Sequence, residues 1–568
     1  MTQGEIKFET LGSFSGRGST LNALVGPAPE GKEWLYVSYA YVQGGMHIVA
    51  FDPDTGAFKI FENPEGGAWA LEVGPDGKIY AGTFYNGHIL RLDPKAEKLE
   101  DLGQAIPGES YIWTLSCGPD GKIYGGTYPG AKLLQFDPST GKCTDLGRMD
   151  PVENYNRSTA AGSDGWVYCG IGTARANLVA FNPATRERRS LIPEDKRSIG
   201  TGSVMLGADG KVYGTCLGQN YLLENGRATP IEKLPSAKPR TVLKDGRPVS
   251  ASPAYKGKEL ALFRVAAGPD GKIYASSVMP EYLLVFDPTT RELKNLGLIP
   301  GAEAYSMLAH QDKLYIASYT GATLQIYDPK KPFNPGSKKE NNPAFYGSVA
   351  PYQDRPYDIC LGSDGKIYLA CVPSYGHHGG ALAWFDPKTQ EIGHIFAPVP
   401  DQAVSALCAL PDGLLAVGTS IEGGPGTHPK AKEAVLFLWD TKSQRKVFEC
   451  VPVPGAGSIA ALTFGKDKLI YGVSGETMFI FDPAKRKILT SAIYRPGGGL
   501  ARAGLQTLPD GTILALAGNS VLKPKFSNGK LEFVELCKFE RHISCGFALL
   551  DGYVYFASGT DLVRFQLP

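Results

Sequence analysis

The chain has 568 residues, which is more than one hydrophobic core usually supports, so several domains or a repeat fold are expected. A formal net charge of +1 argues against a protein that binds nucleic acid through phosphate contacts. Hydrophobic residues make up 43% of the chain, which excludes disorder, and no apolar run is long enough to span a membrane as a helix. We therefore expect a folded protein with no nucleic-acid or membrane partner.

The first residues, Met1-Thr-Gln-Gly-Glu5, lack the charged and then apolar pattern of a secretory leader. No signal peptide is expected in this sequence. The compartment stays open between the cytoplasm and a secreted or periplasmic location with the leader removed.

A turn followed by apolar strands recurs along the whole chain. One copy reads Gly118-Pro-Asp-Gly-Lys-Ile-Tyr-Gly-Gly-Thr127, followed by the apolar run Leu133-Leu-Gln-Phe-Asp-Pro138. The Pro-Asp-Gly turn begins a strand because its glycine supplies the positive φ, and Asp-Pro closes the next strand. Successive copies begin near Trp69, Trp113 and Thr159, a period of about 45 residues that is typical of one four-stranded β-propeller blade.

About twelve such units fit between Leu21 and the C-terminus, so the sequence predicts an all-β fold of one or more β-propellers built from four-stranded blades. The pattern resembles propellers of the quinoprotein and Kelch type. The tryptophan-bearing fourth strand of quinoprotein repeats is missing, so a quinone cofactor is not expected.

The best candidate for a boundary between two rings lies at residues 330–352, where a unit ends without its usual fourth strand. The final unit stops after its third strand, at Val563–Pro568, and the segment Lys7–Gly12 reads as a lone fourth strand that could complete that unit or fill this vacancy. Filling the vacancy gives seven blades up to about residue 335. We therefore expect a seven-bladed propeller over residues 1–335 and five further blades over residues 336–568. One large ring, or six blades plus six, stays open.

Two classes of loop, those entering the innermost strand and those joining the second and third strands, share one face of a propeller. In this chain these loops hold most of the eight histidines together with many Tyr, Trp, Arg and Asn residues, whereas the opposite loops are plain turns. Aromatic rings cover pyranose faces, Arg binds carboxylate or sulfate in bidentate fashion, and His or Tyr can move protons. This face is therefore the predicted ligand site.

Two clusters of loop residues stand out. The first joins the entry residues Arg355 and Tyr357 to a middle loop with Tyr375, His377 and His378, and the next blade adds His428 on a Gly-rich loop. The second comes from four consecutive blades and contains His47, Tyr85, His88, Tyr111, Tyr128, Asn156 and Arg157. Adjacent histidines could also hold a metal, so a divalent cation is an open alternative, although no cofactor is firmly predicted.

In architecture alone, the chain resembles the bacterial β-propeller lyases that cleave uronic-acid polysaccharides. This resemblance implies β-elimination on a polysaccharide or oligosaccharide. Arg355 or Arg157 would neutralise the substrate carboxylate, and His378, His377 or His88 would take the proton next to it. Tyr375 or Tyr85 would protonate the leaving oxygen. The alternatives are a propeller that binds glycan or protein without catalysis, and a propeller glycoside hydrolase.

Overall fold

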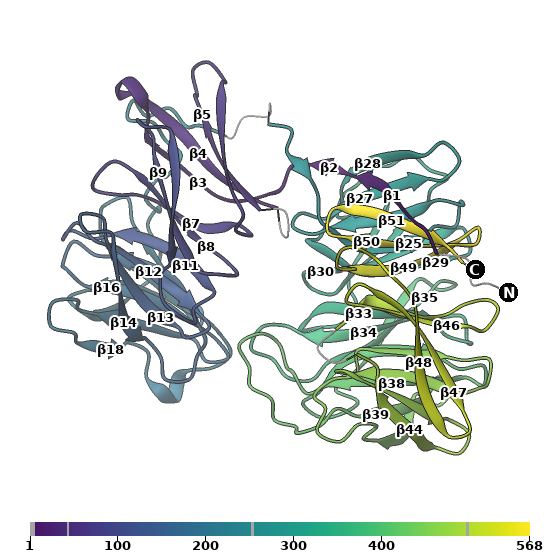
Figure 1. The fold of residues 1–568 in the computed structure, drawn as a ribbon. Coiled ribbons are helices and arrows are strands. Elements are labelled where there is room, and N and C mark those ends of the chain that lie inside the picture. The colour runs from purple at the N-terminus through teal and green to yellow at the C-terminus, as the bar shows by residue number, and fades with distance from the viewer. Residues whose placement is uncertain (1–5, 42–44, 251–254, 496–498, 568) are drawn as a thin grey trace. The chain divides into compact units, whose positions relative to one another are not determined.

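The computed structural model describes residues 6–41, 45–250, 255–495 and 499–567 (Figure 1). Two short 3₁₀ turns, η1 (Pro29–Gly31) and η2 (Glu194–Lys196), are the helical elements of these residues, and every other element is a strand. None of the helices in the described part of the chain has the length and apolarity needed to cross a membrane. The prediction of an all-β propeller fold is confirmed.

The chain divides into two compact units, Arg17–Lys258 and the combination of Met1–Gly16 with Glu259–Pro568. The described residues of the first form five antiparallel sheets, so we call it the five-bladed unit. Its strands are β3 (Ser19–Pro27), β4 (Glu33–Ala40), β5 (Met46–Phe51), β6 (Phe58–Asn63); β7 (Ala68–Val73), β8 (Ile79–Thr83), β9 (His88–Asp93), β10 (Lys98–Gln104); β11 (Tyr111–Cys117), β12 (Ile123–Tyr128), β13 (Lys132–Asp137), β14 (Lys142–Arg148); β15 (Tyr155–Ala161), β16 (Val167–Thr173), β17 (Asn177–Phe181), β18 (Arg188–Ser190), with β19 (Gly200–Thr201) beside β16; and β20 (Ser203–Leu206), β21 (Val212–Cys216), β22 (Gln219–Glu224), β23 (Arg227–Ile231).

The segment 236–248 links the last sheet of the five-bladed unit to the first. Lys238 N–H donates to Leu206 O at 2.8 Å, and Val25 N–H donates to Arg240 O at 2.6 Å. The segment then turns back as a hairpin, because Leu243 N–H donates to Arg247 O at 3.0 Å. Residues Lys244-Asp-Gly-Arg247 form the turn of this hairpin, and the segment that contains them helps to join the two ends of the unit.

The described residues of the second unit form six sheets of the blade type, and one of these joins two blades into eight strands, so the unit has seven blades and we call it the seven-bladed unit. Its strands are β25 (Leu262–Ala267), β26 (Ile273–Ser277), β27 (Tyr282–Asp287), β28 (Glu292–Leu298); β29 (Glu303–His310), β30 (Lys313–Tyr319), β31 (Thr323–Tyr327), β32 (Ala344–Ser348); β33 (Gln353–Leu361), β34 (Ile367–Pro373), β35 (Ala381–Asp386), β36 (Glu391–Phe396); β37 (Ala403–Ala409), β38 (Leu414–Ser420), β39 (Leu436–Asp440), β40 (Arg445–Cys450); β41 (Ala461–Phe464), β42 (Ile470–Ser474), β43 (Thr477–Asp482), β44 (Lys487–Ile493); β45 (Leu500–Thr507), β46 (Ile513–Ala517), β47 (Ser520–Ser527), β48 (Lys530–Lys538); and β49 (Cys545–Leu550), β50 (Tyr553–Ser558), β51 (Asp561–Gln566), β1 (Phe8–Ser13). The short strands β2 (Ser15–Gly16) and β24 (Lys258–Glu259) lie where the chain passes from one unit to the other.

The N-terminal strand completes the final blade. Figure 1 shows the purple strand β1 beside the yellow strand β51, and their register pairs Phe8 with Phe565 and Ser13 with Asp561. The innermost strand β49 of this blade packs against β25, the innermost strand of the first blade of the unit. The ring is thereby closed, which removes two sheet edges that would otherwise be exposed.

The predicted division into residues 1–335 and 336–568 was wrong. Residue 335 falls inside a blade, because β32 pairs with β31 after a long connection and supplies the fourth strand that appeared to be missing. The N-terminal strand consequently completes the last blade and not this one. The seven-bladed and five-bladed units are therefore built from different stretches of chain than expected.

The recurring Asp-Gly-Lys-Ile-Tyr motif has a common structural basis. In the copy at residues 120–124, Asp120 Oδ1 accepts the Lys122 N–H at 3.2 Å and Oδ2 accepts the Tyr124 hydroxyl at 2.7 Å. The same tyrosine–aspartate bond recurs in both units, at Tyr80, Tyr168, Tyr213, Tyr274, Tyr368 and Tyr471. The motif therefore fixes the turn to the buried strand that follows it.

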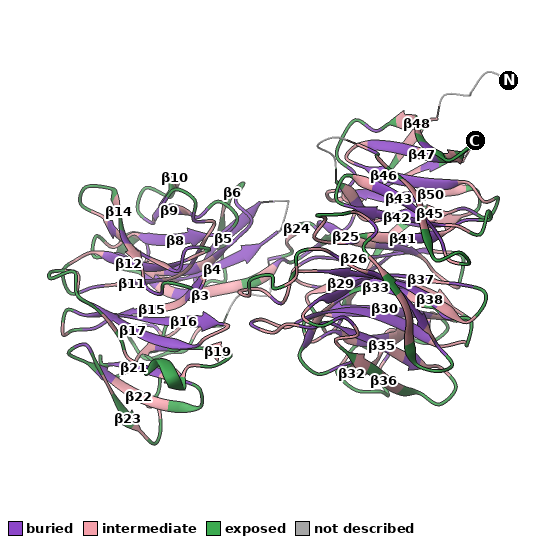
Figure 2. Cartoon of the chain, turned by 90° about the horizontal axis from the view of Figure 1, so that it is seen from below, coloured by how far each residue is buried: buried purple, intermediate pink, exposed green. Residues whose placement is uncertain are grey.

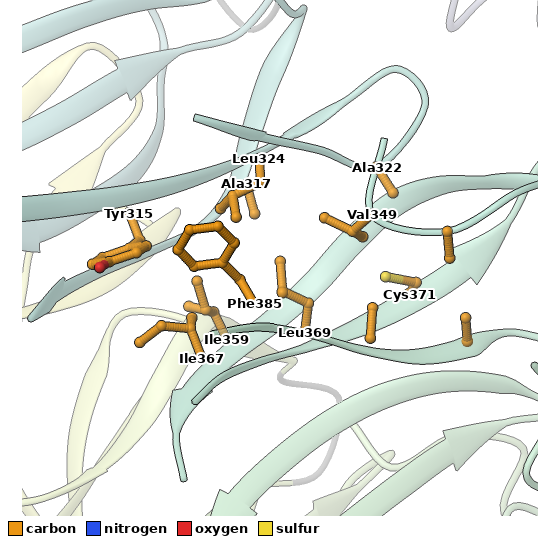
Figure 3. Close-up of a cluster of buried hydrophobic side chains, with 13 residues drawn as sticks. Tyr315, Ala317, Ala322, Leu324, Val349, Ile359, Ile367, Leu369, Cys371 and Phe385 are labelled. Carbon is orange, nitrogen blue, oxygen red and sulfur yellow. The ribbon is translucent and has the colours of Figure 1, made fainter. Parts of the chain in front are cut away.

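Hydrophobic side chains fill the spaces between neighbouring sheets. Figure 2 shows buried residues concentrated in the strands and exposed residues in the turns and loops. In Figure 3, Tyr315 of β30 and Ile367 and Phe385 of the next sheet belong to one such cluster. The rings of Tyr315 and Phe385 lie 6.1 Å apart. Packing of this kind holds the blades rigid, so the loops at their ends have fixed positions.

Candidate functional site at the mouth of the seven-bladed unit

Irregularities in the innermost strands position the side chains of the site. Most innermost strands pair with their neighbour through a register shift, as at Ala304/Ser306 and Pro356/Asp358. A β-bulge re-aims the extra residue, which is why bulges often occur beside functional sites. The residues at these shifts are Leu21, Trp69, Trp113 and Arg157 in the five-bladed unit, and Phe263, Tyr305, Tyr357, Ser405 and Arg502 in the seven-bladed unit.

A cavity of about 720 Å³ lies among the innermost strands of the seven-bladed unit. Its charged and aromatic lining comes from Arg355, Tyr357, Glu422 and Arg502. Small residues such as Ser405 make up much of the remaining wall. The result is a polar hollow with two guanidinium groups on its wall.

Both arginines rest on aromatic rings. The Arg355 guanidinium lies 4.4 Å from the Tyr319 ring centroid and 5.5 Å from that of Tyr375. The Arg502 guanidinium lies 3.7 Å from the Phe263 centroid. Such contacts stabilise a cation without neutralising it.

Neither Arg355 nor Arg502 forms an ion pair with a carboxylate of the described residues, unlike Arg197, which pairs with Asp150 at 2.7 Å. Arg355 Nη1 is buried and has no hydrogen-bond partner. The cavity wall thus carries positive charge that no ion pair of the described protein neutralises.

Glu303 and two tyrosines complete the surroundings of the arginines. The rings of Tyr305 and Tyr357 are stacked at 5.1 Å with an interplanar angle of 9°, and Arg502 lies 5.0 Å from the Tyr305 centroid. Burial raises the pKa of Glu303, while the charges of Arg502 and Arg355 oppose this shift. Burial also raises the pKa of Tyr305, so its hydroxyl keeps its proton.

A second cavity of about 420 Å³ shares Tyr357 and Ala503 with the first and contains Asp358 and Arg264. Asp358 accepts the backbone N–H groups of Ile359 at 2.9 Å and Leu407 at 2.8 Å. Burial nevertheless raises the pKa of Asp358 to about 6, and the Arg264 charge opposes the shift only in part. The 420 Å³ cavity thus contains the Asp358 carboxyl, whose pKa lies in the mildly acidic range.

Buried acids and amides before the innermost strands tie down the middle loops. Glu109 accepts the Thr127 hydroxyl at 2.6 Å and the Gly130 N–H at 2.9 Å. In the seven-bladed unit, Gln353 anchors a middle loop in the same way, because its Oε1 accepts the Ala381 N–H at 3.1 Å. The loops predicted to bind ligand are therefore anchored to their own blades.

The structure brings together only part of the first predicted cluster. Arg355 and Tyr357 line the 720 Å³ cavity, and Tyr375 lies against Arg355. His377 instead stacks on Tyr352 at 4.7 Å.

The other two histidines of this cluster are also not among the described residues that line the cavity. Burial lowers the pKa of His378, whose Nδ1 lies next to the backbone of Gly423, and His428 is exposed. No histidine is among the described residues that line this cavity. In the described part of the chain, no group of three or more His, Cys, Asp or Glu is arranged to hold a metal ion.

The second predicted cluster lies in the five-bladed unit, where both histidines already have partners. His47 is buried, hydrogen bonds to the Tyr255 hydroxyl and has Nε2 2.9 Å from Glu62. Burial lowers the pKa of His47. His88 Nδ1 lies 3.0 Å from both carboxylate oxygens of Asp101.

The remaining residues of this cluster form a continuous set of aromatic contacts. Tyr111 contacts the exposed Tyr85 at 6.0 Å and Tyr128 at 5.5 Å. Arg157 lies 4.6 Å from the ring centroid of Tyr155. Asn156 is fully buried and donates to Lys132 O at 3.1 Å, so its role in this structure is to support the fold.

The selection of site residues from the sequence left out Glu303, Tyr305 and Arg502, although they belong to the entry loops of the predicted face, and it missed Phe263. All four lie at or next to the start of an innermost strand, a signal that was available from the repeat pattern. Their direction could not be predicted, because it depends on bulges that leave no distinct mark in the sequence.

No protein-family model and no curated protein matches the chain. Among solved structures, it is similar to the extracellular domain of the putative hybrid two-component system BT3049 from B. thetaiotaomicron, with 14% identity, 97% of this chain and 68% of that chain covered, and a TM-score of 0.39. It is also similar to PorZ, a surface component of the type-IX secretion system of Porphyromonas gingivalis, with 11% identity, coverage of 98% and 87%, and a TM-score of 0.42. Virginiamycin B lyase from Staphylococcus aureus shows 12% identity, coverage of 54% and 96%, and a TM-score of 0.40. No residue or activity is transferred from these proteins.

Proposed function

We propose that the seven-bladed unit binds an acidic glycan at the 720 Å³ cavity. The observation that carries the proposal is the pair Arg355 and Arg502, which line one cavity and form no ion pair with the described carboxylates. A guanidinium fork matches the planar carboxylate of a uronic acid, and two forks would hold it from two sides. The ring of Tyr357, which lines the cavity and is stacked on Tyr305, offers apolar surface to the sugar itself.

Cleavage of a uronic-acid polysaccharide by β-elimination is the finer form of this proposal. The arginines would stabilise the charge that develops on the carboxylate when the neighbouring C–H bond breaks. Glu303 or Tyr357 would accept that proton, and Tyr305 would donate one to the leaving oxygen as the C–O bond breaks and a C=C bond forms. These groups replace the histidines predicted as bases: Tyr357 lines the cavity, Tyr305 is stacked on it, and Glu303 interacts electrostatically with both arginines, whereas no histidine is among the described lining residues.

Binding without cleavage is the second candidate function. The same absence of a histidine from the described lining favours it, because imidazole is the usual proton acceptor near neutral pH. The cation pair would act equally well in a protein that only binds an acidic chain.

A screen of polygalacturonate, alginate, pectin and glycosaminoglycans distinguishes these functions. Binding is followed by calorimetry, and elimination by the ultraviolet absorbance of the unsaturated product. We expect at least one acidic polymer to bind, with Arg355→Gln weakening the binding and His378→Ala leaving it unchanged. Binding that requires His378 and not Arg355, or no binding across the screen, would contradict the proposal.

A further inference from the structure

The five-bladed unit carries a set of rings that the proposed function does not use. They come from three consecutive blades and are Trp69 of β7, Phe84 and Tyr85 after β8, Tyr111 and Trp113 of β11, Tyr128 of β12 and Tyr155 of β15. We call this set the aromatic belt.

The rings of the belt contact one another in sequence around the unit. Trp113 is stacked on Tyr111 at 5.1 Å with an interplanar angle of 19°, and it lies 5.9 Å from Trp69. Tyr128 and Tyr155 lie 4.5 Å apart at 32°. Tyr85 is 47% exposed, so one end of the belt presents a ring to solvent.

The belt is held in place by polar groups behind it. Buried Glu65 accepts the Thr83 hydroxyl at 3.0 Å and the Asn86 side-chain amide at 2.9 Å, which fixes the loop that holds Tyr85. Glu109 fixes the loop that follows Tyr128 through Thr127. A surface whose rings are fixed in advance loses little conformational entropy when it binds.

The charges around the belt differ from those at the seven-bladed cavity. Arg157 lies over Trp113 at 4.9 Å and contributes a single guanidinium. Buried carboxylates lie behind the belt at Glu65, Glu109 and Glu153. A polyanion such as nucleic acid would need a row of cations, and the negative charge behind the rings opposes it. Ring faces with few charges instead fit the apolar faces of uncharged sugars.

We propose that the aromatic belt is a second carbohydrate site, which binds neutral pyranose chains independently of the acidic-glycan site. Sugar rings would pack on Tyr85 and Trp69, whereas Trp113, which contacts Tyr111 and Arg157, would orient Arg157 to donate hydrogen bonds to hydroxyl groups at the end of the belt.

The test is a fluorescence and calorimetric titration of the full chain with cello-, xylo-, manno- and malto-oligosaccharides. Two of the six tryptophans belong to the belt, so a bound sugar should change the emission. We expect at least one neutral series to bind, and Trp69→Ala and Tyr85→Ala each to weaken binding about tenfold. Since Tyr85 is exposed, its variant keeps the fold even if Trp69→Ala does not.

Two controls separate this proposal from the first. Trp166→Phe removes a tryptophan that stacks on Arg189 outside the belt, and it should leave the affinity unchanged. Arg355→Gln should also leave it unchanged, because the acidic-glycan site lies in the other unit. Failure of every neutral series to bind, equal affinity in wild type and Tyr85→Ala, or loss of neutral-sugar binding in Arg355→Gln would overturn the proposal.

Discussion

A buried guanidinium group costs free energy unless hydrogen bonds or an opposite charge offset its desolvation. Arg355 and Arg502 are placed on aromatic rings without a carboxylate partner among the described residues, which offsets only part of this cost. An anionic ligand would supply the remainder. In the proposed acidic-glycan complex, these two side chains would thus exchange stability of the free protein for affinity.

Asp358 leads to a prediction about pH. Its pKa in the folded chain is about 6, against 3.8 for the unfolded group, so the folded state binds more protons between these values. Stability contributed by this group is present below the lower pKa and is lost as the pH rises through the window. Asp358→Asn cannot ionise, so its stability relative to wild type should rise by about 2 kcal/mol from pH 4 to pH 7.

Urea unfolding of both proteins at several pH values measures this difference. Because both proteins share all other carboxylates, the contributions of those groups to the pH dependence of unfolding cancel in the difference. An unchanged difference across the window would mean that Asp358 titrates normally in the folded state.

At the scale of single elements, the tyrosine–aspartate bond of the repeated turn makes a testable contribution. Tyr368 donates its hydroxyl to Asp364 at 2.9 Å, and its ring is fully buried. Tyr368→Phe keeps the ring and removes a hydrogen bond to a charged acceptor, so we expect a loss of about 1–2 kcal/mol in unfolding free energy. Chemical denaturation measures it, and Tyr553→Phe, which removes a partly exposed hydroxyl of another blade, should change stability much less.

The elements also show why the sequence predicted the blades better than the site. Turn motifs such as Asp364-Gly-Lys-Ile-Tyr368 lie within one blade and depend on neighbours in the chain, so their recurrence revealed the fold. The direction of Tyr305 or Arg502 depends on a bulge against the second strand, and nothing in the local pattern specifies it. The positions of the loops were thus predictable, whereas the convergence of their side chains was not.

The division into two units depends on pairing between distant parts of the chain. Strand β1 could complete either of two blades that appeared to lack a fourth strand, and the repeat pattern contained no signal that favours one. In the structure, β1 pairs with β51, which lies at the other end of the sequence. In the sequence, the five-bladed unit is consequently inserted between β1 and the other blade strands of the seven-bladed unit.

Removal of residues 1–13 should therefore destabilise the seven-bladed unit alone. The deletion loses the β1–β51 pairing, the packing of Phe8 on Phe539 and the ion pair of Glu9 with Arg564 at 2.7 Å. We expect a loss on the order of 3 kcal/mol in that unit. Hydrogen exchange read by mass spectrometry should show faster exchange in 545–566 and unchanged exchange in 68–148. Uniformly faster exchange in both ranges would show that the two units do not unfold separately.

For the molecule as a whole, the central claim is that Arg355 and Arg502 together hold one acidic group of a glycan. A double-mutant cycle tests it most directly. An oligouronate that binds the wild-type protein is titrated calorimetrically into Arg355→Gln, Arg502→Gln and the double variant. Arg486→Gln, at an exposed position, is the control. We expect each single variant to weaken binding about 10- to 100-fold, and the double variant to lose at least about 1 kcal/mol less than the sum. Unchanged affinity in the double variant, or a loss equal to that of Arg486→Gln, would contradict the claim.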